Sequence, residues 1–142
     1  MDNQKVATQQ DLTLQQLLKL AELEVEALEV IWLYGSRANA TAEEASDYDL
    51  AIAFKDPVDN DLTKPFSSYS GRCEELAYQW SKRTGSEISI VDINKIPAPL
   101  AYSVITDGVV LYIQNTFRQL SEEQRIWSIW EEYKYQYEKY RA

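Results

Sequence analysis

The residues best suited to chemistry lie in a single stretch, Gly35 to Asp49, which reads GSRANATAEEASDYD. In it a Gly-Ser pair is followed, after ten intervening residues, by Asp47-Tyr48-Asp49. A glycine turn lets backbone N–H groups approach a phosphate, and neighbouring carboxylates can bind a divalent cation. The stretch therefore contains the parts of a site for a metal-bound phosphate compound, provided that the flanking elements bring its two ends together.

The two aspartates lie where a predicted strand begins. Side chains alternate along a strand, so Asp47 and Asp49 project to one side, while the apolar face consists of Tyr48, Leu50, Ile52 and Phe54. Two adjacent carboxylates repel each other, and burying them unpaired is costly. Magnesium relieves both problems, because it takes one or two carboxylates together with phosphate oxygens. We therefore predict Asp47 and Asp49 as magnesium ligands and catalytic residues.

The Gly-Ser turn supplies the other half of the predicted site. Gly35 has no side chain to block a phosphate, the Ser36 hydroxyl can donate to a phosphate oxygen, and Arg37 adds positive charge. A Gly-Ser turn alone, or an Asp-x-Asp alone, is usually an ordinary turn or strand end. Their combination favours nucleotidyl transfer, with Gly35, Ser36 and Arg37 as nucleotide-binding residues and Ser36 also catalytic.

Composition narrows the possible chemistry. The chain has 142 residues, 45% hydrophobic and 26% charged, which predicts one globular domain over residues 1–142. Its net charge of −9 disfavours direct binding to nucleic acid or to an anionic membrane. The absence of histidine excludes serine–histidine and cysteine–histidine catalysis. A single cysteine, Cys73, and a polar start without a signal-peptide core predict a cytoplasmic protein.

Hydrophobic periodicity predicts an α/β (α+β) domain with a mostly buried sheet of about four strands and helices against one face. The motif core covers about residues 30–113, and a helical tail covers about 116–142. The predicted strands are Val30–Tyr34, Asp49–Phe54, Glu87–Ile93 and Val109–Ile113, and the predicted helices are Asp11–Glu29, Ser67–Thr84, Leu100–Thr106 and one from Thr116 onward.

The predicted tail helix is unusually aromatic. Its rings are those of Trp127, Trp130, Tyr133, Tyr135, Tyr137 and Tyr140. They are more than one packed face requires, and exposed tyrosine and tryptophan are typical of protein interfaces. A partner surface and packing on the domain itself both remain open.

The segments LYGSRANATAEEASDYDLAIAF and EISIVDINKIPAPLAYSVITDGVVLYI resemble the minimal nucleotidyltransferase (MNT) family of the DNA polymerase β-like superfamily. The resemblance covers about Val30 to Ile113. It implies a polymerase β palm-like fold with a mixed sheet and a long C-terminal helix, a triphosphate held by Gly35 and Ser36, and Mg²⁺ held by Asp47 and Asp49. Family members often have Arg-Gly where this chain has Asn39-Ala40.

One departure concerns a third carboxylate, which the superfamily usually places on the neighbouring strand. Alignment puts Ser89 there, and alternation points Glu87 and Ser89 toward the site but Asp92 away from it. Asp92 serves only if a bulge or the strand end turns it; otherwise it caps the strand end. Three possibilities remain open: Asp92, kept as a candidate catalytic residue, Glu87, or no third carboxylate.

The resemblance also implies a partner and a reaction. MNT proteins are antitoxins of type VII HEPN–MNT toxin–antitoxin modules, so the implied partner is a nearby-encoded HEPN-family RNase toxin in a hetero-oligomer. The implied reaction is adenylylation, in which AMP passes from ATP to a toxin tyrosine. One alternative is a non-catalytic module that neutralises its partner by binding alone, which Ser89 favours. The other is a small-molecule nucleotidyltransferase, which the lack of an acceptor domain disfavours.

Overall fold

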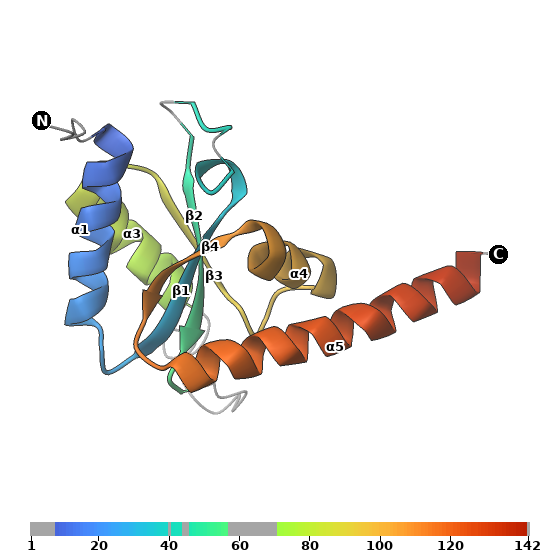
Figure 1. Ribbon diagram of the computed structural model, residues 1–142. Helices are drawn as coiled ribbons and strands as arrows, with labels where there is room; N and C mark the ends of the chain where they lie inside the picture. Colours follow the sequence, from blue (N-terminus) through green and yellow to red (C-terminus); the bar gives the residue numbers. More distant parts are fainter. Residues whose placement is uncertain (1–7, 40, 44–45, 57–70, 142) are drawn as a thin grey trace, which may run out of the picture.

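The computed structural model describes residues 8–39, 41–43, 46–56 and 71–141 (Figure 1). Over these residues the chain forms, in order, α1 (Gln9–Leu23), β1 (Leu28–Tyr34), the 3₁₀ helix η1 (Gly35–Arg37), β2 (Tyr48–Phe54), α3 (Arg72–Thr84), β3 (Ile88–Asp92), α4 (Ala98–Asp107), β4 (Val109–Ile113) and α5 (Thr116–Arg141). No described helix combines the length and the apolar character that a membrane crossing needs.

The four strands form one mixed sheet in the order β3-β2-β1-β4. Strand β1 is antiparallel to β2 and β4, whereas β2 and β3 are parallel. The predicted mixed sheet and long C-terminal helix are confirmed. The register places Asp49 between Tyr34 of β1 and Ser89 of β3. The C-terminal end of β1 and the N-terminal ends of β2 and β3 therefore meet at one end of the sheet.

Helices cover both faces of the sheet, not one face as predicted (Figure 1). On one face, Leu50 and Ile52 of β2 pack with Leu17 of α1 and Trp80 of α3. The residues that alternate with them include Ala51 and Ala53, which belong to a second core cluster with side chains of α4 and α5. Because β2 is apolar on both sides, each face has to be covered by a helical layer.

The first helix is shorter than predicted, because the chain turns into the sheet earlier. A capping box between Thr8 and Asp11 begins α1, and the Glu24 carbonyl accepts hydrogen bonds from the N–H groups of Ala27 and Leu28 after the helix ends. Strand β1 therefore begins at Leu28, which is fully buried. Helix α3 ends, as predicted, at Gly85, whose φ of 73° is left-handed.

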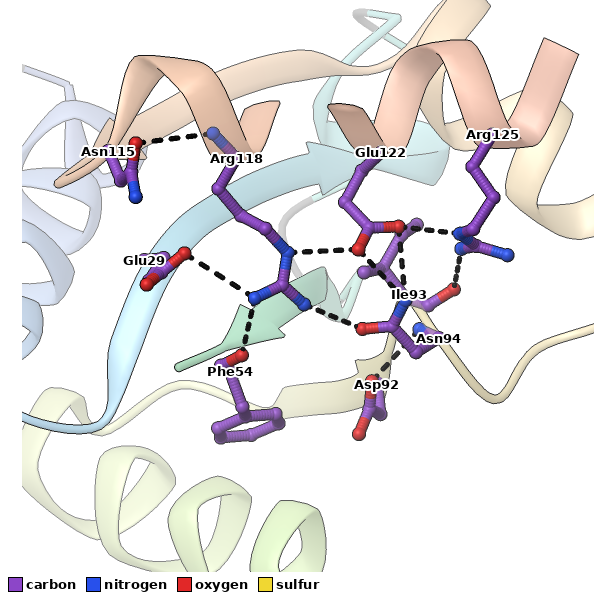
Figure 2. Close-up of polar contacts among 9 residues, drawn as sticks. All are labelled: Glu29, Phe54, Asp92, Ile93, Asn94, Asn115, Arg118, Glu122 and Arg125. Carbon is purple, nitrogen blue, oxygen red and sulfur yellow. Dashed lines mark hydrogen bonds and ion pairs between the residues drawn. The ribbon is translucent and has the colours of Figure 1, made fainter. Parts of the chain in front are cut away.

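Helix α5 spans 26 residues and continues well past the rest of the molecule (Figure 1). Its first part is anchored by a buried polar cluster (Figure 2). Glu122 accepts hydrogen bonds from Nε of Arg118 at 2.9 Å, from Nε of Arg125 at 2.8 Å and from Asn94 Nδ2 at 2.9 Å. Arg118 also donates to the Phe54 carbonyl at 2.8 Å. This cluster joins α5 to the ends of β2 and β3.

Candidate active site

The two predicted metal ligands lie at the end of the sheet where β2 begins. Asp47 is exposed and directly precedes the strand, and Asp49 is half-buried as its second residue. Asp49 has the same strand parity as Ala51 and Ala53, so it lies on the sheet face covered by α4 and α5. Its opposite neighbours in the sheet are Tyr34 and Ser89. The site is therefore built from the ends of three adjacent strands.

The glycine turn and the second aspartate are in close contact. Gly35 has a φ of 72°, and a Cβ atom built on it would lie 2.5 Å from Oδ2 of Asp49. Both the left-handed backbone and the close carboxylate require glycine at this position. From Gly35 the chain continues as η1, which includes Ser36 and Arg37. The structure thus brings together the two halves of the motif, separated by ten residues in the sequence.

No basic side chain of the described residues neutralises the carboxylate pair. Within the described residues, neither Asp47 nor Asp49 forms an ion pair, whereas several other acidic side chains do. Burial, and then the charge of Asp47, raise the pKa of Asp49 above its usual value. A bound cation would relieve the repulsion that raises this pKa. The residues present therefore fit Mg²⁺, which binds one or two carboxylates and completes its shell with phosphate and water oxygens.

Arg37 has structural partners. Its guanidinium lies 4.3 Å from the centre of the Tyr48 ring and donates to the Ser46 carbonyl at 3.0 Å and to Gln10 Oε1 at 3.1 Å. Tyr48 belongs to the face covered by α1 and α3, opposite the face of Asp49. Arg37 therefore ties the motif loop to α1, and binding a phosphate would require it to exchange these contacts.

The structure does not bring Asp92 to the carboxylate pair. Asp92 pairs with Ile52, three residues along from the Asp49–Ser89 pair, so its side chain lies on the opposite face. It is 6% exposed, lies 3.8 Å from Nη2 of Arg72 and accepts a hydrogen bond from the Asn94 N–H at 2.9 Å. No bulge interrupts β2–β3 pairing at this residue. Asp92 caps the end of its strand.

Ser89 and Glu87 lie at the same end of the sheet as Asp49 but do not complete a three-carboxylate site. Ser89 is the direct neighbour of Asp49, and exposed Glu87 precedes β3, where its carbonyl accepts from the Tyr48 N–H at 2.9 Å. Over the described part of the chain, acidic, cysteine and histidine side chains nowhere gather in threes to hold a metal ion. The pair of Asp47 and Asp49 is what the described site offers.

Tyr34 is a site residue that sequence reasoning missed. It is half-buried beside Asp49, and burial, followed by the charge of Asp49, raises the pKa of its phenol. Its alternation with Val30 and Trp32, together with its place next to Gly35, is the signal that could have identified it.

Comparison with known proteins decides the family. The profile of the family described as polymerase beta, nucleotidyltransferase matches residues 14–117. The chain belongs to this family. The match includes the whole Gly35 to Asp49 stretch and all four strands.

Proteins similar to this chain include a protein adenylyltransferase and chains of toxin–antitoxin crystal structures. The protein adenylyltransferase MntA of Shewanella oneidensis is 27% identical over 103 residues, which cover 72% of this chain and 67% of MntA. A toxin–antitoxin crystal structure with AMP-PNP superposes with a TM-score of 0.69 and 23% identity, over 87% of this chain and 90% of that one.

The complex of the tri-AMPylated Shewanella oneidensis HEPN toxin with its MNT antitoxin has a TM-score of 0.63 and 21% identity, over 94% of this chain and 99% of the matched one. At these identities, the solved structures establish the shared fold of this nucleotidyltransferase.

Proposed function

We propose that this nucleotidyltransferase is the antitoxin of a type VII HEPN–MNT module. In the proposed reaction it transfers AMP from ATP, with Mg²⁺, to a tyrosine of a HEPN-family RNase toxin. The observation that carries the proposal is the pair of Asp47 and Asp49, which has no ion-pair partner among the described residues, with Asp49 packed against Gly35. The likeness to a protein adenylyltransferase and to antitoxins in complex with their toxins supports the choice of acceptor.

The chain's own residues have distinct roles in the proposed reaction. Asp47 and Asp49 hold the cation, and Ser36 with the N–H groups of the glycine turn holds the triphosphate. When bound, Mg²⁺ neutralises charge on the phosphate oxygens and orients them for in-line displacement. The acceptor oxygen forms a bond to the α-phosphorus while the bond to the bridging oxygen of the β-phosphate breaks. Pyrophosphate leaves, and the acceptor proton passes to solvent or to a base.

The proposal is tested by separating ATP binding from transfer. Calorimetric titration of ATP, with and without Mg²⁺, should show metal-dependent binding in the wild type that is lost in Asp47→Asn and Asp49→Asn. Asp56→Asn, at the far end of β2, is the matched control and should bind as the wild type does. The toxin, incubated with the wild type and ATP, should gain mass in units of AMP. Unchanged metal-dependent binding in both site variants would refute the metal site.

A second candidate function is favoured by Ser89. Ser89, and not a carboxylate, is paired with Asp49, so this position supplies no base for the acceptor hydroxyl. A protein of this kind could neutralise its toxin by binding alone. The mass measurement distinguishes the two functions: a toxin that is silenced by this chain, yet never gains AMP, supports the binding module.

The proposal places the protein in the cytoplasm with its toxin. Its net charge of −9 supports contact with a protein partner and not with nucleic acid or an anionic membrane. The acidic surface is also compatible with a partner that itself carries a basic RNA-binding site.

A further inference from the structure

The distal part of α5 carries a row of aromatic rings that the proposed active site does not use. Tyr102 of α4 stacks on Trp130 with ring centres 4.5 Å apart, and the row continues to Tyr133 at 5.5 Å and from there to Tyr137 at 6.4 Å. Tyr133, Tyr137 and Tyr140 are 43%, 56% and 78% exposed. The row therefore begins against α4 and ends in solvent.

This aromatic row continues the face by which α5 packs on the domain. Ile126 is fully buried in the core, and Trp130, Tyr133, Tyr137 and Tyr140 follow it at steps of four, three, four and three residues. Residues at these steps lie on one side of a helix. The packing face thus extends past the point where α5 leaves the domain (Figure 1). We call the surface formed by Tyr102 of α4 and the aromatic row of α5 the corner.

The spacing of the aromatic row indicates that an α-helix of another protein would fit against it. Apolar residues at alternating steps of three and four form the seam along which one helix packs on another. Tyr133, Tyr137 and Tyr140, with Gln136, also line an open hollow of about 410 Å³ that can receive side chains of an opposing helix. A helix laid into a groove with such anchors is a common mode of protein recognition.

A second copy of this chain fits the row poorly. The three exposed tyrosines present on the order of 350 Å² per chain. Two paired tails would then bury about 700 Å², below the ~1,200 Å² of a stable interface. The occupant must therefore cover more than the tail, and α4 is the adjoining surface.

The corner is connected to the candidate active site through α4. Helix α4 lies on the same sheet face as Asp49, and its end leads into Gly108. A Cβ atom on Gly108 would lie only 3.3 Å from Cβ of Tyr34, the residue paired with Asp49. A protein seated against α4 and the distal half of α5 is consequently held on the side of the sheet where the carboxylates lie.

We propose that this corner is the docking surface for the protein that accepts the nucleotidyl group, and that a helix of the acceptor lies along the aromatic row with an apolar stripe facing it. The inference rests on the proposed function, because it takes the acceptor to be a protein. It adds the surface of this chain that holds the acceptor and the kind of element that the surface receives.

The chain offers a matched pair of positions for the test. Tyr133 lies on the row, whereas Tyr135 is similarly exposed on the opposite side of the same helix. Cys73 is the single native cysteine, and burial, followed by the charges of Asp92 and Glu74, raises the pKa of its thiol to about 11. A cysteine introduced as Tyr133→Cys or Tyr135→Cys is therefore the reactive thiol at neutral pH.

Each full-length variant is labelled with benzophenone maleimide, added with ATP and Mg²⁺ to an extract of the source cells, and irradiated. The crosslinked protein is identified by mass spectrometry and examined for AMP. We expect the probe at 133 to capture one protein that carries AMP, and the probe at 135 to capture little. The dissociation constant for that protein should then rise about 30-fold in Tyr133→Ala and about twofold or less in Tyr135→Ala.

Three results would overturn the inference: equal capture from both positions, capture of a second copy of this chain, or capture of a protein without AMP. Failure of the proposed function is recognised separately, by ATP titration of the unlabelled wild type against Asp47→Asn. If ATP binding depends on Asp47 and an AMP-carrying protein is crosslinked equally from both positions, the active site stands and the docking surface is wrong.

Discussion

Both ends of the sheet carry buried or half-buried carboxylates, but only one end neutralises them. We call the end where β2 begins the near end and the end where β2 stops the far end. At the far end, Glu122 is 6% exposed and is bound by Arg118, Arg125 and Asn94 (Figure 2). At the near end, Asp49 has Asp47 as its charged neighbour. A neutralised carboxylate holds elements together, whereas an unneutralised pair costs stability and is typical of functional sites.

The pKa shifts follow this contrast. Burial raises the pKa of Glu122, but the hydrogen bonds from Asn94 and Arg125, with the charge of Arg125, outweigh burial and lower the pKa below its usual value. For Asp49, burial and the charge of Asp47 act in the same direction and raise the pKa. The comparison therefore predicts that changes at the far end alter stability and that changes at the near end alter chemistry.

The largest expected effect is on stability at the far end. Glu122→Ala leaves Arg118 and Arg125 without their buried carboxylate and frees the start of α5, which should lower the free energy of unfolding by about 3 kcal/mol. Chemical denaturation followed by circular dichroism measures the loss. Metal-dependent ATP binding at a temperature where the variant is folded should equal that of the wild type. A selective loss of ATP binding would break the division between the two ends.

A carboxylate added at the near end should change the rate and not the fold. Ser89→Asp places a third acidic group beside Asp49, and a general base contributes roughly 10²–10⁴-fold in rate. We expect AMP transfer at least about 100-fold faster with the fold retained, and a slightly lower melting temperature in metal-free protein because the added carboxylate repels Asp49. Asp92→Asn is the control on the other face and should leave transfer nearly unchanged. If Asp92→Asn abolished transfer while ATP binding and melting temperature were retained, the structural assignment of Asp92 would be wrong.

Two glycines with the same backbone conformation test whether the near end depends on close packing. Gly35 and Gly85 have φ of 72° and 73°, but a Cβ on Gly35 meets Asp49, whereas a Cβ on Gly85 meets nothing within 4 Å. Each substitution by alanine should cost about 1 kcal/mol or slightly more in backbone strain. Gly35→Ala should also weaken Mg²⁺-dependent ATP binding about tenfold, because it displaces a carboxylate ligand. Equal ATP affinities in the two variants would refute the contact as a functional one.

The smallest expected effect is a difference in pH dependence. The lowered pKa of Glu122 contributes stability above its unfolded value of about 4.5, and this contribution is lost as the pH falls through the folded value. The raised pKa of Asp49 acts in reverse: its relative stabilisation is present below the unfolded value of 3.8 and is lost as the pH rises.

In metal-free protein at pH 7, Asp49→Asn should therefore raise the melting temperature by about 1–3 °C, and Glu122→Gln should lower it. The difference for Asp49→Asn should shrink as the pH falls below the unfolded value of 3.8, and the difference for Glu122→Gln should shrink as the pH falls through the lowered pKa of Glu122. Melting curves between pH 2.5 and pH 7.5 measure these differences. A melting temperature of Asp49→Asn equal to that of the wild type at pH 7 would show that the carboxylate pair is not under repulsion.

Local signals in the sequence were sufficient for much of the site. Strand alternation alone separates Asp49 from the face of β2 that packs on α1 and α3 and turns Asp92 away from Ser89, and the structure has this arrangement. Alternation is reliable here because β2 is regular and buried, so its register is strongly specified. The turn at Gly35 was equally predictable, since few other residues tolerate its φ.

Features that depend on long-range contacts could not be predicted from local signals. Arg37 is next to Ser36 in the sequence, but Gln10 and Tyr48 determine its direction in the structure. The second helical layer was missed because small residues such as Ala51 and Ala53 indicate neither burial nor exposure until α4 and α5 pack on them. Tyr34 was missed because its significance depends on its neighbour across the strand pair.

The sequence by itself determined the chemistry available to this protein: an acidic pair and a glycine turn at a specific spacing, without histidine and with one cysteine. Residue types and backbone preferences are local properties, so they can be recognised before folding is considered. The tertiary structure decided which carboxylates remain unpaired. Asp92 and Glu122 meet arginines, whereas Asp47 and Asp49 meet each other, because the partners come from elements far apart in the chain and only packing brings them together.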